Sequence, residues 1–331
     1  MKKSLISLAL AALSGAAPAQ SNVTLYGRLD VSLAIAQDKV SRSSTTSMES
    51  GLLNTSLWGL RGSEDLGGGL KANFVLENDF KIDNGSPGTI GSSFGKQAWL
   101  GLAGPWGALK LGRSDTAFDD IRDLAAGANL WDSDLTPSEV VYKAGLRDYA
   151  RRANNQIRYE SPGANGFSAG LSHSLDEQAQ SVKKDVQAFN LRYRGGALDV
   201  GAGFQEQKNN LNPARHLRFT AVSAAYDMGA LLVSGGVNVV NNALHQRDRE
   251  WSIGVTIPRG ALAFSAGYAH STSKTAGVTK SKGSGYAMGA TYALSMHTKV
   301  YVAHFGGDTR SGAGATVANQ RLFAAGFCHD F

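Results

Sequence analysis

The stretch GFSAG, positions 166–170, is the part of this sequence that most resembles a catalytic motif. Its G-x-S-x-G spacing is that of a nucleophile elbow, a strained turn that exposes a reactive serine, here Ser168. The elbow needs a strand before the serine, a helix after it, and a histidine and an acid to complete a triad. Here a turn precedes the serine and a strand-like alternation follows it. The motif therefore does not favour catalysis, and an esterase stays only as an alternative.

Phosphate and metal chemistry are not indicated either. GSPGTIGSSFGK, positions 85–96, is rich in glycine, but its glycine spacing is wrong for a phosphate loop, and Gln97 follows where Ser or Thr would bind magnesium. The seven histidines never pair at a ligand spacing. Asp119, Asp120 and Asp123 could attract calcium, but the EF-hand spacing is absent. We predict no enzyme, no cofactor and no metal site.

The start of the chain predicts export. Two lysines precede an apolar run over residues 5–13, and Ala17-Pro18-Ala19 forms an A-x-A cleavage site. We therefore expect residues 1–19 to be a signal peptide that is removed, and residues 20–331 to be one domain. Without its two lysines the 33 basic residues become 31 against 27 acidic ones, about +4. This mild, dispersed charge argues against a nucleic-acid partner.

Stability must come from something other than disulfides or membrane helices. A single cysteine, Cys328, excludes a disulfide within the exported chain. After the leader, no apolar stretch approaches the roughly 18 residues of a transmembrane helix. We therefore expect a fold built from β-strands.

Period-two alternation runs through most of the sequence. Clear cases are WSIGVTIP (251–258), QAFNLRYR (187–194) and GYAMGATYAL (285–294). Alternation of this kind predicts antiparallel sheet with one apolar and one polar face. A soluble sandwich would turn the apolar face inward, whereas an outer-membrane barrel would turn it toward lipid.

The connections between these strands favour the barrel. Seven tight turns alternate with eight longer polar connections, as in bacterial outer-membrane barrels. The tight turns are expected at 65–69, 104–107, 162–166, 195–196, 227–229, 258–260 and 295–296, and the longer connections at 37–53, 82–93, 115–153, 175–182, 208–214, 241–248, 271–283 and 307–316. Together they predict an all-β, sixteen-stranded antiparallel transmembrane β-barrel with strands of about 9–13 residues.

The end of the sequence, FAAGFCHDF, fits this fold. Phe331, His329, Phe327 and Phe323 share one face of the last strand. Phe331 is thus expected in the aromatic girdle at the membrane interface.

Taken together, the sequence resembles the general-diffusion porins of Gram-negative bacteria, in particular the betaproteobacterial group. The stretches that carry the resemblance are NVTLYGRLD (22–30), WGLRGSEDLGGGLKANFVLE (58–77), FGKQAWLGLAGPWGALKLGR (94–113), NNQIRYESPGANGFSAGLSHS (154–174) and the ending GFCHDF. The resemblance implies a homotrimer in the outer membrane that contacts lipid and lipopolysaccharide. It also implies insertion by machinery that reads Phe331, and passive diffusion of ions and small hydrophilic solutes.

In such porins the third long loop folds into the lumen and narrows it, which assigns that role here to residues 114–153. The resemblance makes the loop's acids candidates for the constriction, namely Asp115, Asp119, Asp120 and Asp123. Basic candidates for the facing wall are Lys71, Lys96, Arg113, Arg151, Arg152 and Arg158. Opposed charges of this kind would set up a field that sorts permeants by charge. Leu57 stands where the family commonly has Arg, which leaves the ion preference open.

Two alternatives to a general porin remain at this point. A substrate-specific channel would need aromatic residues along the lumen, whereas the alternation places most of them toward lipid and leaves Trp131 unassigned. A surface adhesin or structural barrel would need longer external loops than most of those expected here.

Overall fold

The computed structural model describes residues 22–126, 136–141, 145–146, 148–176 and 185–331. The predicted signal peptide lies outside the described residues, so its removal stays a prediction. The strands are β1 (Asn22–Asp38), β2 (Ser43–Ser50), β3 (Leu57–Gly67), β4 (Leu70–Asp79), β5 (Gln97–Gly104), β6 (Gly107–Asp115), β7 (Arg152–Glu160), β8 (Phe167–Ser174), β9 (Val186–Gly195), β10 (Leu198–Gln207), β11 (Leu217–Asp227), β12 (Leu232–Asn242), β13 (Gln246–Arg259), β14 (Leu262–Thr275), β15 (Val278–Ala293), β16 (Thr298–Ser311) and β17 (Thr316–Asp330). The other described elements are the helices α2 (Asp119–Ala126) and α3 (Pro137–Val141) and the 3-10 turn η2 (Pro213–Arg215). Among the described residues, no helix combines the length and the apolar run that a bilayer crossing requires.

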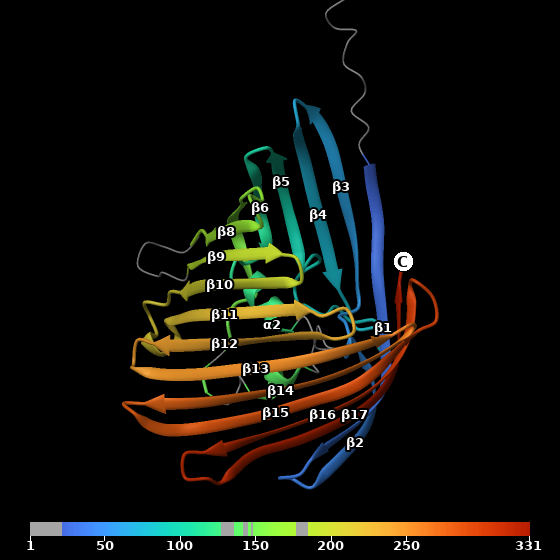
Figure 1. The fold of residues 1–331 in the computed structure, drawn as a ribbon. Helices are drawn as coiled ribbons and strands as arrows, with labels where there is room; N and C mark the ends of the chain where they lie inside the picture. Colours follow the sequence, from blue (N-terminus) through green and yellow to red (C-terminus); the bar gives the residue numbers. More distant parts are fainter. Residues whose placement is uncertain (1–21, 127–135, 142–144, 147, 177–184) are drawn as a thin grey trace, which may run out of the picture.

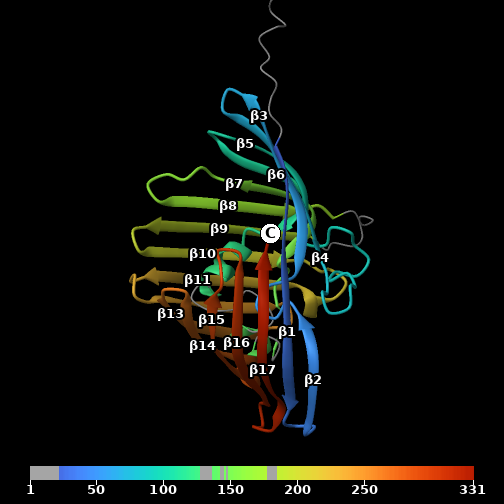
Figure 2. The same ribbon diagram turned by 90° about the vertical axis from the view of Figure 1, so that its right-hand side faces the viewer.

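The strands form one closed antiparallel sheet. It closes because β1 pairs with β17 along one edge and with β2 and β3 along the other. Residues 22–28 of β1 pair with β3, and residues 31–38 pair with β2, so these two strands share one place in the wall. The seventeen described strands therefore occupy sixteen positions, and the predicted sixteen-stranded barrel is confirmed. Figures 1 and 2 show the strands around one interior, with β1 beside β17.

The two faces of this wall differ as the alternation predicts. The outer face carries exposed apolar side chains, among them Leu25, Leu33, Leu100, Leu111, Leu171, Leu191, Val237, Ile253, Phe264 and Val302. The inner face carries buried polar side chains, among them Gln156, Asn190, Gln205, Ser223, Asn238 and Ser271. A continuous apolar outer surface is unfavourable in water and matches the hydrocarbon of a bilayer.

The two rims differ less than predicted. The seven tight turns lie where expected and define one rim, called the turn side here. On the opposite rim, the loop side, only four of the eight connections are long; the connections at 39–42, 243–245, 276–277 and 312–315 are tight. Strand pairing continues through the residues expected as loops, where Ser271 and Ser273 are buried inward and Lys274 is exposed outward. Near the loop-side rim both faces of the wall are polar, so hydropathy alternation does not reveal that these residues form a strand.

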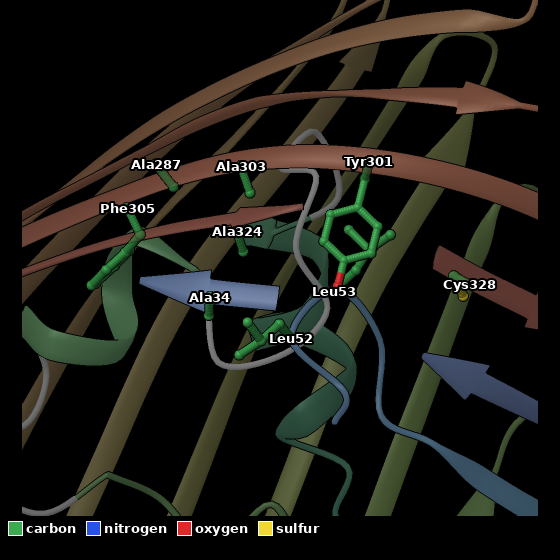
Figure 3. Close-up of a cluster of buried hydrophobic side chains, with 9 residues drawn as sticks. All are labelled: Ala34, Leu52, Leu53, Ala287, Tyr301, Ala303, Phe305, Ala324 and Cys328. Carbon is green, nitrogen blue, oxygen red and sulfur yellow. The ribbon is translucent and has the colours of Figure 1, made fainter. Parts of the chain in front are cut away.

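A short inward bulge separates β2 from β3. The buried carboxylate of Asp30 accepts hydrogen bonds from the backbone N–H groups of Leu53 (2.8 Å) and Asn54 (2.6 Å) and from the Tyr301 hydroxyl (2.8 Å). These bonds turn Leu52 and Leu53 into the barrel. There they pack with Ala34, Ala287, Tyr301, Ala303, Phe305, Ala324 and Cys328, the cluster drawn in Figure 3. The bulge thus supplies a small apolar core inside a largely polar lumen.

The described parts of the third loop-side connection, residues 116–126, 136–141, 145–146 and 148–151, fold into the barrel as predicted. Helix α2 packs against β9 to β13, and α3 packs against β14 to β16. Figure 1 shows α2 within the ring of strands. Glycines on the inner wall make this close approach possible: a Cβ added at Gly201 would lie 2.5 Å from the Ile121 Cδ1 atom, and one at Gly236 would lie 3.0 Å from the Ala125 Cβ atom.

Candidate pore constriction

Apolar packing fixes where α2 lies, and this position in turn places the predicted acids. Phe118 and Ile121 are fully buried. The Phe118 ring lies 6.0 Å from the Phe219 ring and 5.2 Å from the Tyr149 ring, measured between centroids. Burying each of these side chains contributes about 1.5–3 kcal/mol. The first turn of α2, with Asp119 and Asp120, is therefore held against the wall.

Asp120 heads a chain of ion pairs along the inner wall, called the salt-bridge ladder here. The Arg158 guanidinium donates to both Asp120 oxygens (2.8 and 3.0 Å), and its Nε lies 3.0 Å from Glu160 Oε1. Lys110 Nζ donates to the same Glu160 oxygen at 2.7 Å. Asn190 donates to Asp120 from β9, two strands beyond β7, at 2.8 Å. The loop acid and wall base were predicted, whereas Glu160 and Lys110 were missed.

Asp119 is not exposed to the lumen. Its side chain is 3% exposed and accepts hydrogen bonds from the Tyr149 hydroxyl and from Arg151 Nε (3.2 Å). Burial raises the pKa of the Asp119 carboxyl well above its usual range, and the nearby Asp123 carboxylate adds to this, whereas Arg151 opposes it. The prediction that Asp119 lines the constriction is therefore wrong. It is a buried anchor for the returning end of the connection.

Asp123 is the most exposed of the four acids predicted for the constriction. Its side chain is 50% exposed, and Arg151 Nη2 donates to both of its oxygens at 3.1 and 3.2 Å. Arg151 therefore bridges Asp119 and Asp123, one buried and one exposed. It was predicted for the wall, but it belongs to the connection itself, one residue before β7.

Asp115, the last residue of β6, and Arg152, the first residue of β7, pair with each other. Arg152 Nε lies 2.9 Å from Asp115 Oδ1, and the two residues are also partners in the strand register. Arg113 of β6 pairs in register with Ala98 of β5 and lies two residues after the outward Leu111. Its guanidinium donates to the Gly95 carbonyl and the Asn154 side chain. A bulge in the β6–β7 pairing lies at Arg113, and its lumen position stays a prediction.

The two predicted lysines lie at different levels of the barrel. Lys96 immediately precedes β5 on the loop side, and its backbone N–H donates to the Glu77 carbonyl at 3.2 Å. Lys71 is exposed beside the tight turn between β3 and β4, in the inner-face row that includes Glu160 three strands away. Three strand spacings correspond to about 14 Å. Trp131 lies outside the described residues.

Two aromatic side chains on the inner wall also escaped sequence reasoning. Arg61 lies over the Tyr26 ring, with its Cζ 4.9 Å from the ring centroid, and the Tyr26 hydroxyl donates to Glu77 at 2.8 Å. Lys110 Nζ lies 4.9 Å from the centroid of Trp99. Each aromatic residue alternates with outward Leu residues, so the parity of the strand could have revealed both.

A buried acid of β13 holds the far end of the third connection. Asp248 accepts a hydrogen bond from the backbone N–H of Leu146. Glu250, two residues further along β13, instead accepts a hydrogen bond within the wall, from Asn238 of β12 at 2.6 Å. Both acids are at most 4% exposed. Asp248 lay within the predicted connection 241–248, whereas Glu250 lay just beyond it.

The described residues offer ion pairing and hydrogen bonding rather than bond-making chemistry. Within the described ranges, no cluster of three or more His, Cys, Asp or Glu residues could hold a metal ion. Ser168 lies inside β8, where it pairs with Arg192 and no helix follows it, so the nucleophile-elbow geometry is not formed.

Phe331 closes the barrel next to the first strand. Its backbone N–H and carbonyl both bond to Gly27 at 3.0 Å. A Cβ at Gly27 would clash with the Phe331 ring, so the glycine gives the ring its place. The ring is 51% exposed.

Comparison with known sequences places the chain among channel proteins. The profile of the family described as Gram-negative porin matches residues 7–311. Outer membrane porin protein 32 of Delftia acidovorans is 34% identical over 248 residues, covering 71% of this chain and 68% of that protein. Major outer membrane protein P.IB of Neisseria meningitidis serogroup B is 29% identical over 285 residues, covering 82% of each.

Solved structures share the fold. An anion-selective porin from Comamonas acidovorans superposes with a TM-score of 0.79 at 24% identity, covering 94% of this chain and all of that one. The trimer form of OmpT from Vibrio cholerae gives 0.72 at 18% identity, covering 94% and 99%. With the closed barrel, its apolar outer surface and the inward third connection, these matches establish that the chain belongs to the Gram-negative porin family and is a porin of the outer membrane.

Proposed function

We propose that this chain forms a water-filled channel for passive diffusion of ions and small hydrophilic solutes, narrowed by its third loop-side connection. The observation that carries the proposal is the salt-bridge ladder. It ties the connection to the inner wall through Asp120 and Arg158, while the exposed Asp123 remains beside the lumen. The channel is proposed to sort permeants by size at this level and by charge through Asp123, Lys110 and their neighbours.

Recording from the purified protein in a planar bilayer tests this. The expected result is large, long-lived conductance steps with a linear current–voltage relation, and a reversal potential across a salt gradient that gives the ion preference. Uptake of neutral sugars of increasing size into liposomes would set the size limit. Folded, inserted protein that carries no current would refute the diffusion channel.

A trimer is proposed as the working assembly. It is supported by the family resemblance and by the shared fold with the trimer form of OmpT. Current steps that close in three equal parts, together with a mass of three chains in detergent, are expected. A single conductance level and a monomer mass would contradict the trimer without affecting the channel.

Assembly is proposed to use Phe331, recognised by the outer-membrane insertion machinery, and to end in contact with lipid and lipopolysaccharide. The support is the exposed Phe331 ring beside Gly27. Phe331→Ala should lower the yield of assembled barrel in cells more than Phe323→Ala, which removes an equally exposed ring of β17. Equal yields would remove the special role of Phe331.

A substrate-specific channel is the second candidate, because Tyr26 with Arg61 and Trp99 with Lys110 place two cation–aromatic pairs on the inner wall. Such pairs would slow planar anions as they pass. If the current is blocked at micromolar concentrations by an aromatic acid, and Trp99→Ala abolishes the block, this candidate replaces the general porin.

We also propose that the chain has no catalytic activity, in line with the family of channels to which it belongs. Hydrolysis of a chromogenic ester by the purified protein, lost in Ser168→Ala, would overturn this.

A further inference from the structure

A cleft of about 650 Å³ lies between the returning end of the third connection and the loop-side ends of β9, β10 and β11. It is called the vestibule cleft here. Strand register puts Val186, Gln207 and Leu217 in one row, and Leu217 lies on the inner face of β11 with Phe219. The cleft therefore faces the lumen near the loop side, and its described lining includes no residue of the salt-bridge ladder. Its volume is in the range of pockets that hold small ligands.

The floor of the vestibule cleft is apolar and held in place. Its side chains are Leu146, Tyr149, Ala150, Val186 and Leu217. Leu146 and Leu217 belong to the buried cluster that also holds the start of α2, and Tyr149 packs against this cluster. The fully buried Gln205 donates from its Nε2 atom to the Ala150 carbonyl at 3.0 Å. A floor fixed in this way loses little conformational entropy when a ligand binds.

Two charged side chains of opposite sign line the cleft and remain available to a ligand. Asp148 comes from the third connection and Arg215 from η2, and both are exposed. Within the described part of the chain, neither of them takes part in an ion pair. Lys208 also lines the cleft, but its Nζ atom donates to Asp185 Oδ2 at 2.9 Å, which neutralises its charge. The cleft thus offers one acid and one base.

Local hydrogen bonds define where this acid and this base lie. The Asn212 side chain caps η2 and accepts from the Ala214 N–H at 3.1 Å, which holds the turn that carries Arg215. On the other side, the Tyr149 N–H donates to Asp148 Oδ1 at 2.8 Å. Because the two charged groups are too far apart to pair with each other, a ligand can contact both.

The pattern of charges favours one class of ligand. An anion would be attracted by Arg215 and repelled by Asp148, and a cation would meet the reverse. A zwitterion satisfies both groups through charge-assisted hydrogen bonds. Exposed ion pairs alone contribute little to affinity, so burial of an apolar body on the floor must supply part of it.

We propose that the vestibule cleft binds a small zwitterion with an apolar body, the chemistry of dipeptides and amino acids that carry apolar side chains. The ammonium group lies at Asp148, the carboxylate at Arg215, and the side chains on the apolar floor. The inference rests on the proposed function, because such a solute reaches the cleft through the lumen.

The test is binding of the dipeptide Leu-Leu to the full folded protein in detergent, measured by isothermal titration calorimetry. Asp148→Asn and Arg215→Gln should each weaken binding about tenfold. The matched controls are Asp227→Asn, an exposed acid on the turn side, and Arg218→Gln, an exposed base on the outer face of β11. Both controls should bind Leu-Leu as the wild type does.

Blocked dipeptides separate recognition of charge from structural damage. N-acetyl-Leu-Leu lacks the ammonium group and should bind the wild type about tenfold more weakly, whereas acetylation should make no further difference in Asp148→Asn. Leu-Leu amide lacks the carboxylate, and its deficit should disappear in Arg215→Gln. A variant that weakens all three ligands by the same factor would show that its side chain only supports the fold, which would overturn its assigned role.

Other results would also overturn the proposal. These are equal binding of Leu-Leu by the wild type and both variants, Gly-Gly binding as tightly as Leu-Leu, and N-acetyl-Leu-Leu binding the wild type as tightly as Leu-Leu. Leucine itself distinguishes the two sources of this chemistry, because tighter binding of leucine than of Leu-Leu would make the amino acid the ligand of the same cleft. Protein that conducts but does not bind would overturn this inference alone, whereas protein that binds Leu-Leu but carries no current would refute only the diffusion channel.

Discussion

The two helices described in the third connection are held to the barrel by different sets of contacts. At α2, close apolar packing against the wall is joined by ion pairs, in which guanidinium groups fix the carboxylates of Asp119 and Asp120. At α3, Val141 and Pro137 lie against Gly285 and Ser271, and the described polar contact is a single hydrogen bond of 2.7 Å from the Ser271 hydroxyl to the Val141 carbonyl. Both anchors need small residues on the wall, but only the α2 anchor adds ion pairs of defined direction.

This difference separates two tasks. Ion pairs at α2 determine where charge lies in the lumen, because each acid has a base at a defined position. Small residues at α3 determine only how closely the backbone approaches the wall. Damage to the α2 anchor should therefore change both stability and ion preference, whereas damage to the α3 anchor should change stability and pore size alone.

The largest effect is expected from breaking the salt-bridge ladder. Arg158→Met leaves Asp120 and Glu160 without their buried partner, whose side chain is 7% exposed. Removing one member of a buried pair costs about 3–5 kcal/mol. Urea-induced unfolding in detergent should show this loss. The double variant Arg158→Met, Asp120→Leu should recover part of it, and a double variant that is no more stable than Arg158→Met would mean that Asp120 contributes nothing to the anchor.

Crowding the α3 anchor should lower the stability by less than breaking the salt-bridge ladder does, and it should not alter the ion selectivity. At Gly285 an added side chain meets the Pro137 carbonyl and Val141. Gly285→Val should destabilise by about 1–3 kcal/mol and displace α3. Conductance is expected to change while the reversal potential stays constant. Gly163→Val, placed where the structure leaves open space, is the control; a shifted reversal potential in Gly285→Val alone would erase the proposed division between the anchors.

The sequence predicted the barrel well because lipid imposes a period of two on every strand that it touches. Trp251 and Ile253 are outward for that reason. At the loop-side ends of β13 and β14, beyond the lipid, the alternating residues are charged or carry hydroxyl groups instead of being apolar. Hydropathy therefore predicted loops where the structure has strands. Asp119 was misplaced for a related reason: sequence reveals an acid but not the Tyr149 and Arg151 that bury it. The split of the second barrel strand into β2 and β3 has no periodic signal at all.

An effect of similar size is expected from Tyr149, whose hydroxyl donates to Asp119. Burial raises the pKa of the Tyr149 phenol well above its ordinary value, and the Asp119 carboxylate adds to this. Tyr149→Phe should cost about 1.5–3 kcal/mol at pH 7, as for a hydrogen bond to a charged group. The unfolded phenol ionises near pH 10, about its ordinary pKa. The stability difference between wild type and Tyr149→Phe should therefore be constant below that pH and shrink above it. A difference that does not shrink above about pH 10 would show that the phenol is not the donor.

The smallest free-energy effect is expected at the two acids that Arg151 joins, the exposed Asp123 and the buried Asp119. Comparing them is also the sharpest test of the α2 anchor. Asp123→Lys places a positive charge where water and ions reach the side chain. At a few ångströms in water each unit of charge is worth about 1 kcal/mol to a passing ion, and this substitution changes the charge by two units, so the permeability ratio should move toward anions by more than about fivefold. Asp119→Asn removes a buried group and should leave the ratio nearly unchanged while weakening the anchor. Reversal potentials across a tenfold salt gradient measure both. If Asp119→Asn shifts the ratio as strongly as Asp123→Lys, then the field of the buried acid reaches the lumen, and burial alone does not decide which acids of the connection govern selectivity.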